Sequence, residues 1–175
     1  MAILNKIRVN IGCGQTPTEG WHNYDNSLSL RLARIPILSK IVVALPLIPQ
    51  APKDFMSFVQ TSDIKWADAT KRIPESDGTV DVLYSSHMLE HINRDKAKDF
   101  LYEAKRVLRS GGIIRIAVPD IRLLIEDYLK NEDADDFMSK TELVTGRPTT
   151  LLKRLQYVIV GERSHQWMYD GKSLC

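Results

Sequence analysis

The sequence predicts an α/β domain built on a doubly wound, mostly parallel sheet. Short apolar runs that read as buried strands alternate along the chain with amphipathic helical stretches, and this alternation is typical of a parallel sheet covered by helices. The length of 175 residues favours one domain, 1–175. The hydrophobic fraction of 43% and the charged fraction of 26% are those of an ordinary soluble globular protein.

Each element can be placed from its pattern. Asn93 is a suitable N-cap for a first long helix, whose end we expect at the Gly111-Gly112 pair, with Arg106 and Arg109 in its last turn. A second helix should run from Ile121 to Lys130. The core-facing stripe of the first helix should contain Ala97, Phe100, Leu101, Ala104, Val107 and Leu108. The predicted strands are 7–12, 21–25, a short strand within 62–70, 80–84 and 113–118.

A largely apolar segment, 35–52, interrupts the pattern within an insertion of about 28–60. It contains a lysine and four prolines, and Pro46 and Pro49 would break a membrane-spanning helix. We therefore expect a lid or a buried insertion packed on the domain. The alternative is peripheral membrane contact through 31–53, where basic residues flank the apolar part: Arg31, Arg34, Lys40 and Lys53.

Charge and cysteine usage bear on partners and location. The formal net charge is only +2 and no basic block stands out, so the sequence does not predict a nucleic-acid partner. Cys13 and Cys175 lie at opposite ends of the chain, which argues against a structural disulfide and fits a reducing cytoplasm. The N-terminus runs directly into the first strand pattern, so we expect no signal peptide.

A glycine pair, Gly12 and Gly14, follows the first strand and suggests a cofactor-binding turn. A nicotinamide-binding turn would have a third small residue near Pro17, and its ribose-binding acid would lie about 20 residues further on. Here Asp25 is much nearer. No Gly-Lys-Ser/Thr follows, so a phosphate loop is also excluded. The spacing to Asp25 leaves no room for a full helix, and we expect an irregular first crossover.

The motifs taken in order resemble the signature of class I S-adenosylmethionine-dependent methyltransferases, which have a Rossmann-like fold. They are "NIGCG" at 10–14 with Asp25, "ADA" at 67–69, "VDVLYSSHMLEHI" at 80–92 and "RVLRSGGIIRIAVPD" at 106–120. The chain is most similar to a small bacterial, type 11-like subgroup with "GCG…GWxNxD", "SxHxLEH" and "HxWMYD", the last at 165–170.

The resemblance implies S-adenosylmethionine as cofactor. Bare backbone at Gly12 and Gly14 would pass the methionine portion where a side chain would collide, and Asp25 would accept two ribose hydroxyls. Asp68 would accept from the adenine amino group while Ala69 presents its N–H. The family usually has an acid where Asn10 stands. The expected cofactor-binding set is Gly12, Cys13, Gly14, Asp25, Asn26, Asp68, Ala69 and Ser86.

Three residues are candidates for the chemistry. His87, just past the fourth strand, is placed as a base, or is a structural loop histidine. Asp120 could bind the acceptor or cap the following helix. His165, with 167–170, could line the acceptor pocket, or these aromatic residues could be core. Glu90 reads as a capping carboxylate.

Two further inferences concern cysteine and metal. Cys13 reads as a small buried residue rather than a nucleophile. The four histidines and two cysteines show no metal-ligand spacing, so the sequence predicts no metal site.

The expected activity is methyl transfer to an oxygen or nitrogen acceptor on a small molecule or a glycan- or lipid-linked intermediate. Nucleic-acid methylation lacks both a basic stripe and an Asn-Pro-Pro-aromatic motif. The family's sheet continues with two more strands, whereas this sequence stops at "YDGKSLC", so we expect a C-terminally shortened sheet with an open edge. An open edge favours a homodimer. The alternative function is a non-catalytic cofactor-binding or scaffold module completed by a partner chain.

Overall fold

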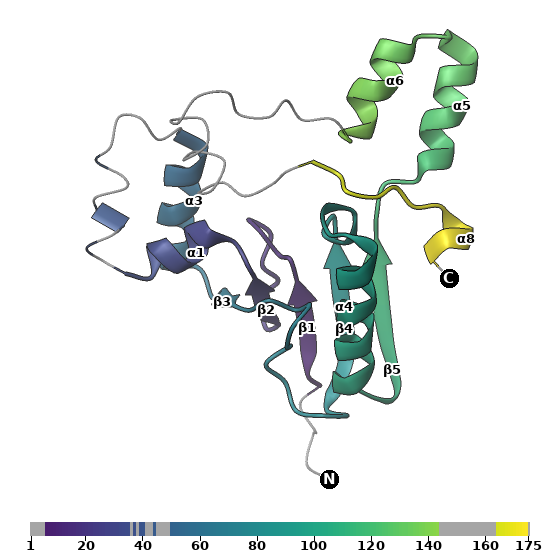
Figure 1. The fold of residues 1–175 in the computed structure, drawn as a ribbon. Helices are drawn as coiled ribbons and strands as arrows, with labels where there is room; N and C mark the ends of the chain where they lie inside the picture. The colour runs from purple at the N-terminus through teal and green to yellow at the C-terminus, as the bar shows by residue number, and fades with distance from the viewer. Residues whose placement is uncertain are drawn as a thin grey trace.

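The computed structural model describes residues 6–35, 37, 39, 40, 44, 50–143 and 164–174. Its centre is a sheet of five strands in the order β3-β2-β1-β4-β5 (Figure 1), and every pairing between them is parallel. The predicted doubly wound, parallel architecture is therefore confirmed. The strands are β1 (Arg8–Ile11), β2 (His22–Asp25), β3 (Lys65–Trp66), β4 (Val80–Ser86) and β5 (Leu108–Ala117).

Helices lie around this sheet, with α4 against one face and the α5–α6 pair beyond the end of β5 (Figure 1). The prediction of a helix starting at Ile121 is confirmed, since α5 begins there. The helices are α1 (Leu28–Ala33), α3 (Gln50–Thr61), α4 (Arg94–Val107), α5 (Ile121–Asn131), α6 (Ala134–Thr141) and α8 (Gly171–Leu174), with a 3-10 turn, η1 (Leu89–His91).

The helix α4 starts where the sequence predicts and ends earlier. The Asn93 side chain accepts from the Lys96 N–H at 2.9 Å, which confirms the N-cap. Four residues of the expected stripe are buried, whereas Leu101 is 42% exposed. The helix ends at Val107, and Arg109 already belongs to β5 together with Leu108.

The glycine pair at 111–112 does not stop the helix; both residues lie within β5. Gly111 has φ +73°, and the pairing of β4 with β5 shifts register near its start, between Val80 and Val82. A β carbon on Gly112 would lie 3.0 Å from the Val80 carbonyl oxygen. The glycines therefore serve an irregular strand start, which uses the same backbone freedom as a helix cap.

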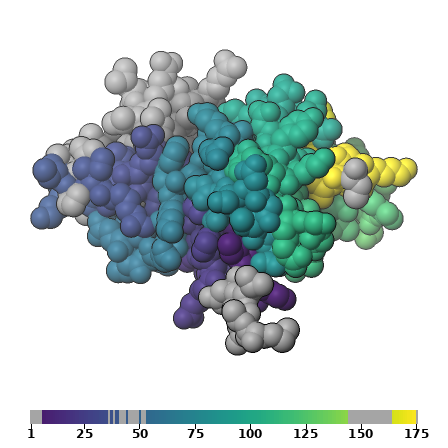
Figure 2. Space-filling view, turned by 90° about the horizontal axis from the view of Figure 1, so that it is seen from below, coloured from purple at the N-terminus to yellow at the C-terminus, as the bar shows by residue number. Residues whose placement is uncertain are grey.

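Two groups of buried residues form the core. The larger joins the strands to α4 and contains Val9, Leu83 and Phe100. The smaller joins α1 and α3 to Cys13 of the glycine turn, through Leu30 and Met56. The view from the end where the strands begin shows the α1–α3 side (blue) and the α4–β5 side (teal to green) flanking the N-terminal strand (Figure 2).

The smaller core bears on the predicted insertion. Because its helices α1 and α3 pack on Cys13, the described part of 28–60 covers one side of the glycine turn. Most of the apolar stretch from 36 to 49 lies outside the described residues, as does much of the segment considered for membrane contact. No helix among the described residues is long and apolar enough to cross a membrane.

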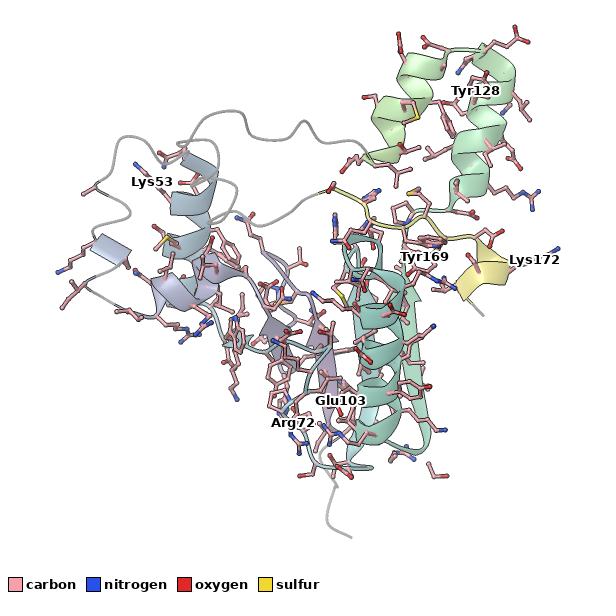
Figure 3. All side chains as sticks on the ribbon, viewed as in Figure 1. Lys53, Arg72, Glu103, Tyr128, Tyr169 and Lys172 are labelled. Atoms are coloured by element: carbon pink, nitrogen blue, oxygen red, sulfur yellow. The ribbon has the colours of Figure 1, made fainter. Side chains whose placement is uncertain are left out.

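The other edge of the described sheet is β5. Its Ile113 is 60% exposed and Ile114 is 39% exposed. Beyond β5 the chain segment 164–170 returns, and Tyr169 pairs with Asp120 in an isolated parallel bridge. Figure 3 shows Tyr169 on this segment, near the start of α4. The predicted homodimer remains a prediction.

Candidate functional site

The candidate site lies at the carboxyl ends of the strands, where β1 and β4 are neighbours. The chain leaves β1 toward β2 on one side, and β4 lies on the other side of β1, so the strand order reverses here. Open parallel sheets bind ligands at such a switch point. A pocket of about 620 Å³ lies instead in the insertion, beside Ala33 and Met56, and none of its lining residues comes from the strand ends.

The glycine turn folds over the end of β2. The N–H groups of Gly12 and Cys13 both donate to the Tyr24 carbonyl oxygen, at 2.8 and 3.2 Å. Gly12 has φ +69°, and a β carbon there would lie 2.8 Å from Cγ of Met88. The loop after β4 therefore requires a glycine at position 12, and the contact of Gly12 with the cofactor stays a prediction.

Gly14 is different, because its position faces open space. It has φ +50°, and a β carbon added there would meet nothing within 4 Å. Its N–H donates to Oδ2 of Asp25 at 3.1 Å, while Oδ1 of the same carboxylate accepts from the Ser27 N–H at 2.8 Å. Each carboxylate oxygen keeps a second lone pair. The turn therefore places an accepting carboxylate beside bare, open backbone.

A buried asparagine pair replaces the helix that this crossover lacks. Nδ2 of Asn10 donates to the Thr16 carbonyl oxygen at 3.2 Å and to Oδ1 of Asn23 at 3.4 Å. Asn23 in turn donates to the carbonyl oxygens of Thr18 and Trp21, both at 3.0 Å, and accepts from the Thr18 N–H at 2.8 Å. Asn10 is 3% exposed. Its amide holds the irregular crossover, which explains why this strand position is not an acid here.

The remaining predicted cofactor residues border the same end of the sheet. Oδ1 of Asp68 accepts from the Thr70 hydroxyl at 2.7 Å, and Lys71 lies 3.4 Å from Oδ2. Burial alone would raise the pKa of Asp68, but the hydrogen bonds from Thr70 and Lys71 outweigh it and the pKa is lowered. Ala69 is buried in the main core. The Asn26 carbonyl oxygen accepts from Trp66.

The end of β4 combines strain with an unpartnered polar atom. His87 directly follows the strand and has φ +51°, a left-handed conformation that is uncommon for residues other than glycine. Ser85, one residue before Ser86, is 1% exposed, and its hydroxyl has no hydrogen-bond partner among the described residues. Ser85 pairs in register with Ile11, so this hydroxyl belongs to the β1–β4 switch point.

His87 and Glu90 form a pair at this edge. Nδ1 of His87 lies 3.1 Å from Oε1 of Glu90; the histidine side chain is 69% exposed and the glutamate side chain 1%. A carboxylate oxygen that accepts from Nδ1 leaves Nε2 of the imidazole free to take a proton. Glu90 was expected to cap a helix start, and this is wrong: no side chain caps η1, and Glu90 is buried beneath His87.

The other two catalytic candidates are placed differently. Asp120 caps α5, since its carboxylate accepts from the Arg122 N–H at 3.0 Å, so the capping alternative is confirmed. His165 is buried, and its Nδ1 lies 2.8 Å from the Thr141 carbonyl oxygen. Of the aromatic residues after it, Tyr169 is core at 2% exposed and Trp167 is 45% exposed.

Cys13 behaves as a small core residue. It is 3% exposed, and burial first, then the neighbouring charge of Asp25, raises its pKa to about 12. A thiol that stays protonated at neutral pH is a poor nucleophile. The expectation that Cys13 is buried and unreactive therefore agrees with its surroundings.

Sequence reasoning missed the contact of Met88 with Gly12 and the Asn10–Asn23 pair. The two asparagines, polar residues inside an otherwise apolar strand pattern, gave a signal that could have been followed. Ser85 follows from the sequence as a polar residue at the end of its strand, but its lack of a partner among the described residues does not.

Comparison with known families bears on the class of this protein. The family model of a methyltransferase domain, type 11, matches residues 31–116, a region that starts after the glycine turn and ends within β5. The matched region, about half of the chain, is therefore similar to the methyltransferase domain of type 11, in agreement with the family that the sequence motifs resemble. No curated protein matches the chain significantly.

Solved structures show the same fold at low identity. A S-adenosylmethionine-dependent methyltransferase from Methanosarcina mazei aligns with a TM-score of 0.53 and 15% identity, over 97% of this chain and 76% of that one. A glycopeptide N-methyltransferase in complex with S-adenosyl-L-homocysteine aligns with a TM-score of 0.39 and 10% identity, over 63% of this chain. A TehB-like methyltransferase from Corynebacterium glutamicum aligns with 0.38 and 18%, over 64%.

The chain spans about half the length of the two last-named structures, 42% and 54%. The Methanosarcina structure supports the fold of this chain.

Proposed function

We propose that this chain binds S-adenosylmethionine at the β1–β4 switch point and transfers its methyl group to an oxygen or nitrogen acceptor. One observation carries the proposal: the Gly14 N–H holds the Asp25 carboxylate, at 3.1 Å, beside backbone with no neighbour within 4 Å of an added β carbon. An accepting carboxylate suits a sugar diol, and uncharged backbone suits a cofactor that has no phosphate.

The residues present fit this cofactor. Asp25 keeps one lone pair on each oxygen for the ribose hydroxyls, and Asp68, whose pKa is lowered, stays an acceptor at neutral pH for an amino group. The unpartnered hydroxyl of Ser85 supplies a further polar group at the switch point. When bound, S-adenosylmethionine supplies a methyl carbon activated by the positive sulfur.

His87 would remove the acceptor's proton. Its imidazole is exposed at the strand end, and Glu90 orients it from below through the 3.1 Å contact with Nδ1. As the new carbon–oxygen or carbon–nitrogen bond forms, the acceptor's proton passes to Nε2, and the carbon–sulfur electron pair remains on sulfur. General-base catalysis of this kind contributes about 10²–10⁴-fold to a rate.

The acceptor belongs, in this proposal, to a small molecule or a glycan- or lipid-linked intermediate, and the location is the cytoplasm. Support comes from the formal net charge of only +2 and the lack of a basic block in the sequence, which does not favour a nucleic-acid acceptor. Incubating the chain with S-adenosylmethionine labelled in the methyl group and a fractionated cell extract tests the class. Label confined to nucleic acid would contradict it.

Equilibrium binding of S-adenosylmethionine tests the cofactor site. Asp25→Ala should weaken binding at least tenfold, because a hydrogen bond to a charged group contributes about 1.5–3 kcal/mol. Asp25→Asn keeps an acceptor for the Gly14 N–H and separates loss of charge from loss of the turn. Asp95→Ala is the control, since that carboxylate is 94% exposed on α4. Equal affinity in all four proteins would show that the ribose is held elsewhere.

The base is tested separately by turnover. His87→Gln should lower kcat by at least 100-fold with little change in cofactor affinity, whereas His22→Gln, an exposed histidine paired with Glu75, should change neither. If the wild-type chain binds the cofactor tightly but transfers no methyl group to any extract fraction, the alternative function, a non-catalytic cofactor-binding module, is favoured.

A further inference from the structure

The fold brings together three side chains that no spacing in the sequence connects. Glu90 and His91 lie on the η1 turn after β4, and His165 lies on the segment that returns past β5. One ligand atom from each, a carboxylate oxygen and two imidazole nitrogens, lies within 4.8 Å of the others. The rings of His91 and His165 are 5.0 Å apart between centroids and tilted by 59°. Glutamate and two histidines are a common ligand set for zinc.

The two imidazoles are oriented by backbone carbonyl groups. Nδ1 of His165 lies 2.8 Å from the Thr141 carbonyl oxygen, and Nδ1 of His91 lies 3.3 Å from the Ser164 carbonyl oxygen. A carbonyl oxygen only accepts, so each Nδ1 carries the proton and each Nε2 keeps its lone pair. Metal-binding histidines are typically held in this way, with one nitrogen donating to a carbonyl and the other facing the ion.

The carboxylate provides an independent observation. Glu90 has a side-chain exposure of 1%. Its Oε1 faces His87, while Oε2 has no hydrogen-bond partner among the described residues. A buried carboxylate oxygen without a partner is strongly disfavoured unless a cation compensates it. The Glu90 carboxylate that carries this oxygen belongs to the same cluster as the two imidazoles.

A fourth group lies close by. Oε2 of Glu142, at the end of α6, is 3.9 Å from Nε2 of His165, and the Glu142 side chain is 62% exposed. Its backbone carbonyl oxygen accepts from the His165 N–H at 3.0 Å, which fixes the two residues together. This carboxylate, or a water molecule, can complete four-coordinate geometry around an ion held by the buried Glu90 and His165 and the partly exposed His91.

We propose that Glu90, His91 and His165 bind a divalent transition-metal ion, for which Zn²⁺ is the best match. In a tetrahedral zinc site the ligand atoms are roughly 3.4 Å apart. Side-chain rotations that move the ligand atoms by about an ångström would bring the observed cluster to this spacing. The ion neutralises the orphaned oxygen of Glu90 and ties the segment 164–170 to the end of β4. Because Oε1 of Glu90 faces His87, the same carboxylate joins this site to the rim of the cofactor site.

Metal titration of the full chain tests the proposal. After removal of metal by a chelator, Zn²⁺ should bind with 1:1 stoichiometry in calorimetry, and Co²⁺ should give the visible absorption bands of a four-coordinate ion. His165→Asn and Glu90→Gln should each weaken Zn²⁺ binding at least 100-fold. His22→Asn is the matched control, because that imidazole also faces a carboxylate, Glu75, at 2.6 Å, and it should leave binding unchanged.

A second measurement on the wild-type chain covers the case in which the variants do not fold. Modification by diethyl pyrocarbonate, mapped by mass spectrometry, should be suppressed by Zn²⁺ at His91 and His165 and unaffected at His22. No Zn²⁺ binding tighter than millimolar, or equal binding by His165→Asn and His22→Asn, would overturn the proposal and leave a metal-free polar cluster. S-adenosylmethionine binding by the metal-free chain separates this result from the proposed function.

Discussion

The two ends of the sheet are built on opposite principles. Because α4 runs back from the end of β4 to the start of β5, its last turn lies where the strands begin. There Arg106 donates to both carboxylate oxygens of Glu103, at 2.8 and 2.7 Å, to Asp77 at 2.6 Å and to the carbonyl oxygens of Ile73 and Glu75, at 2.8 and 3.0 Å. Glu103 appears in Figure 3 at this lower end of α4.

At the end where the strands finish, the buried polar atoms are less completely paired. The Ser85 hydroxyl and Oε2 of Glu90 are buried without partners among the described residues. His87 has positive φ at this end, and among the described residues no ionic network comparable to that of Arg106 holds it. Strain and unpaired polar groups are typical of sites that bind a ligand. The ionic network therefore lies at the end where the strands begin, and the unpaired polar groups lie at the end where we propose that the cofactor binds.

The largest effect expected from this division is at Arg106. Arg106→Met should lower the free energy of unfolding by roughly 3 kcal/mol, because Glu103 would remain partly buried without its partner. Urea denaturation measures the loss. Affinity for S-adenosylmethionine, measured where the variant is still folded, should be unchanged. A parallel loss of affinity would show that the two ends of the sheet are coupled. Arg122→Met, which removes an exposed ion pair on α5, is the control.

The dependence of stability on acidic pH tests the same Arg106–Glu103 interaction. The hydrogen bond from Arg106 is the main cause that lowers the pKa of Glu103 below its usual 4.5. A carboxyl group with a lowered folded-state pKa contributes its full stability above the unfolded value and loses it as pH falls through the folded value. Wild-type stability should therefore fall below about pH 4.5, and Arg106→Met should show a weaker dependence there.

Two positions of the glycine turn, at the same end of the sheet, can be compared directly. Gly12→Ala should cost about 3 kcal/mol, from left-handed strain plus the clash with Met88 at 2.8 Å. Gly14→Ala, with φ +50° and open space, should cost only about 1 kcal/mol. Thermal unfolding ranks the two. In a cofactor titration, affinity should fall more in Gly14→Ala than in Gly12→Ala, because a methyl group at position 14 enters the space that we assign to the ligand. Equal stability losses would mean that Met88 moves away freely.

Asn10 tests the irregular crossover. Asn10→Asp restores the acid usual in the family but removes the amide that donates to Thr16 and Asn23. A carboxylate facing those acceptors cannot donate, so stability should fall by about 1–2 kcal/mol. Asn10→Ser, which keeps a donor, should lose less. Stability equal to or above the wild type in the aspartate variant would show that the loop 15–21 is held by other contacts.

Some of these features could be predicted from the sequence and others could not. The strands, the Asn93 cap and the turn at 12–14 were predictable because each depends on neighbours along the chain. The end of α4 was not, because Gly111 supplies its positive φ to an irregular strand instead of a helix cap. The proximity of Glu90 and His165 was not predictable either, since it depends on where the segment 164–170 returns beside the η1 turn and not on any local pattern.

The smallest effect concerns the thiol beneath the turn. With its pKa raised to about 12, by burial and then by the charge of Asp25, Cys13 stays protonated at pH 8. In a Cys175→Ser variant, where Cys13 is the remaining cysteine, reaction with an aromatic disulfide reagent should be at least 100-fold slower in buffer than in urea. Asp25→Asn removes only the second cause and should speed the reaction slightly. Rapid labelling of the folded chain would mean that α1 and α3 do not stay packed on the turn, and the cover they give the cofactor side would be lost with it.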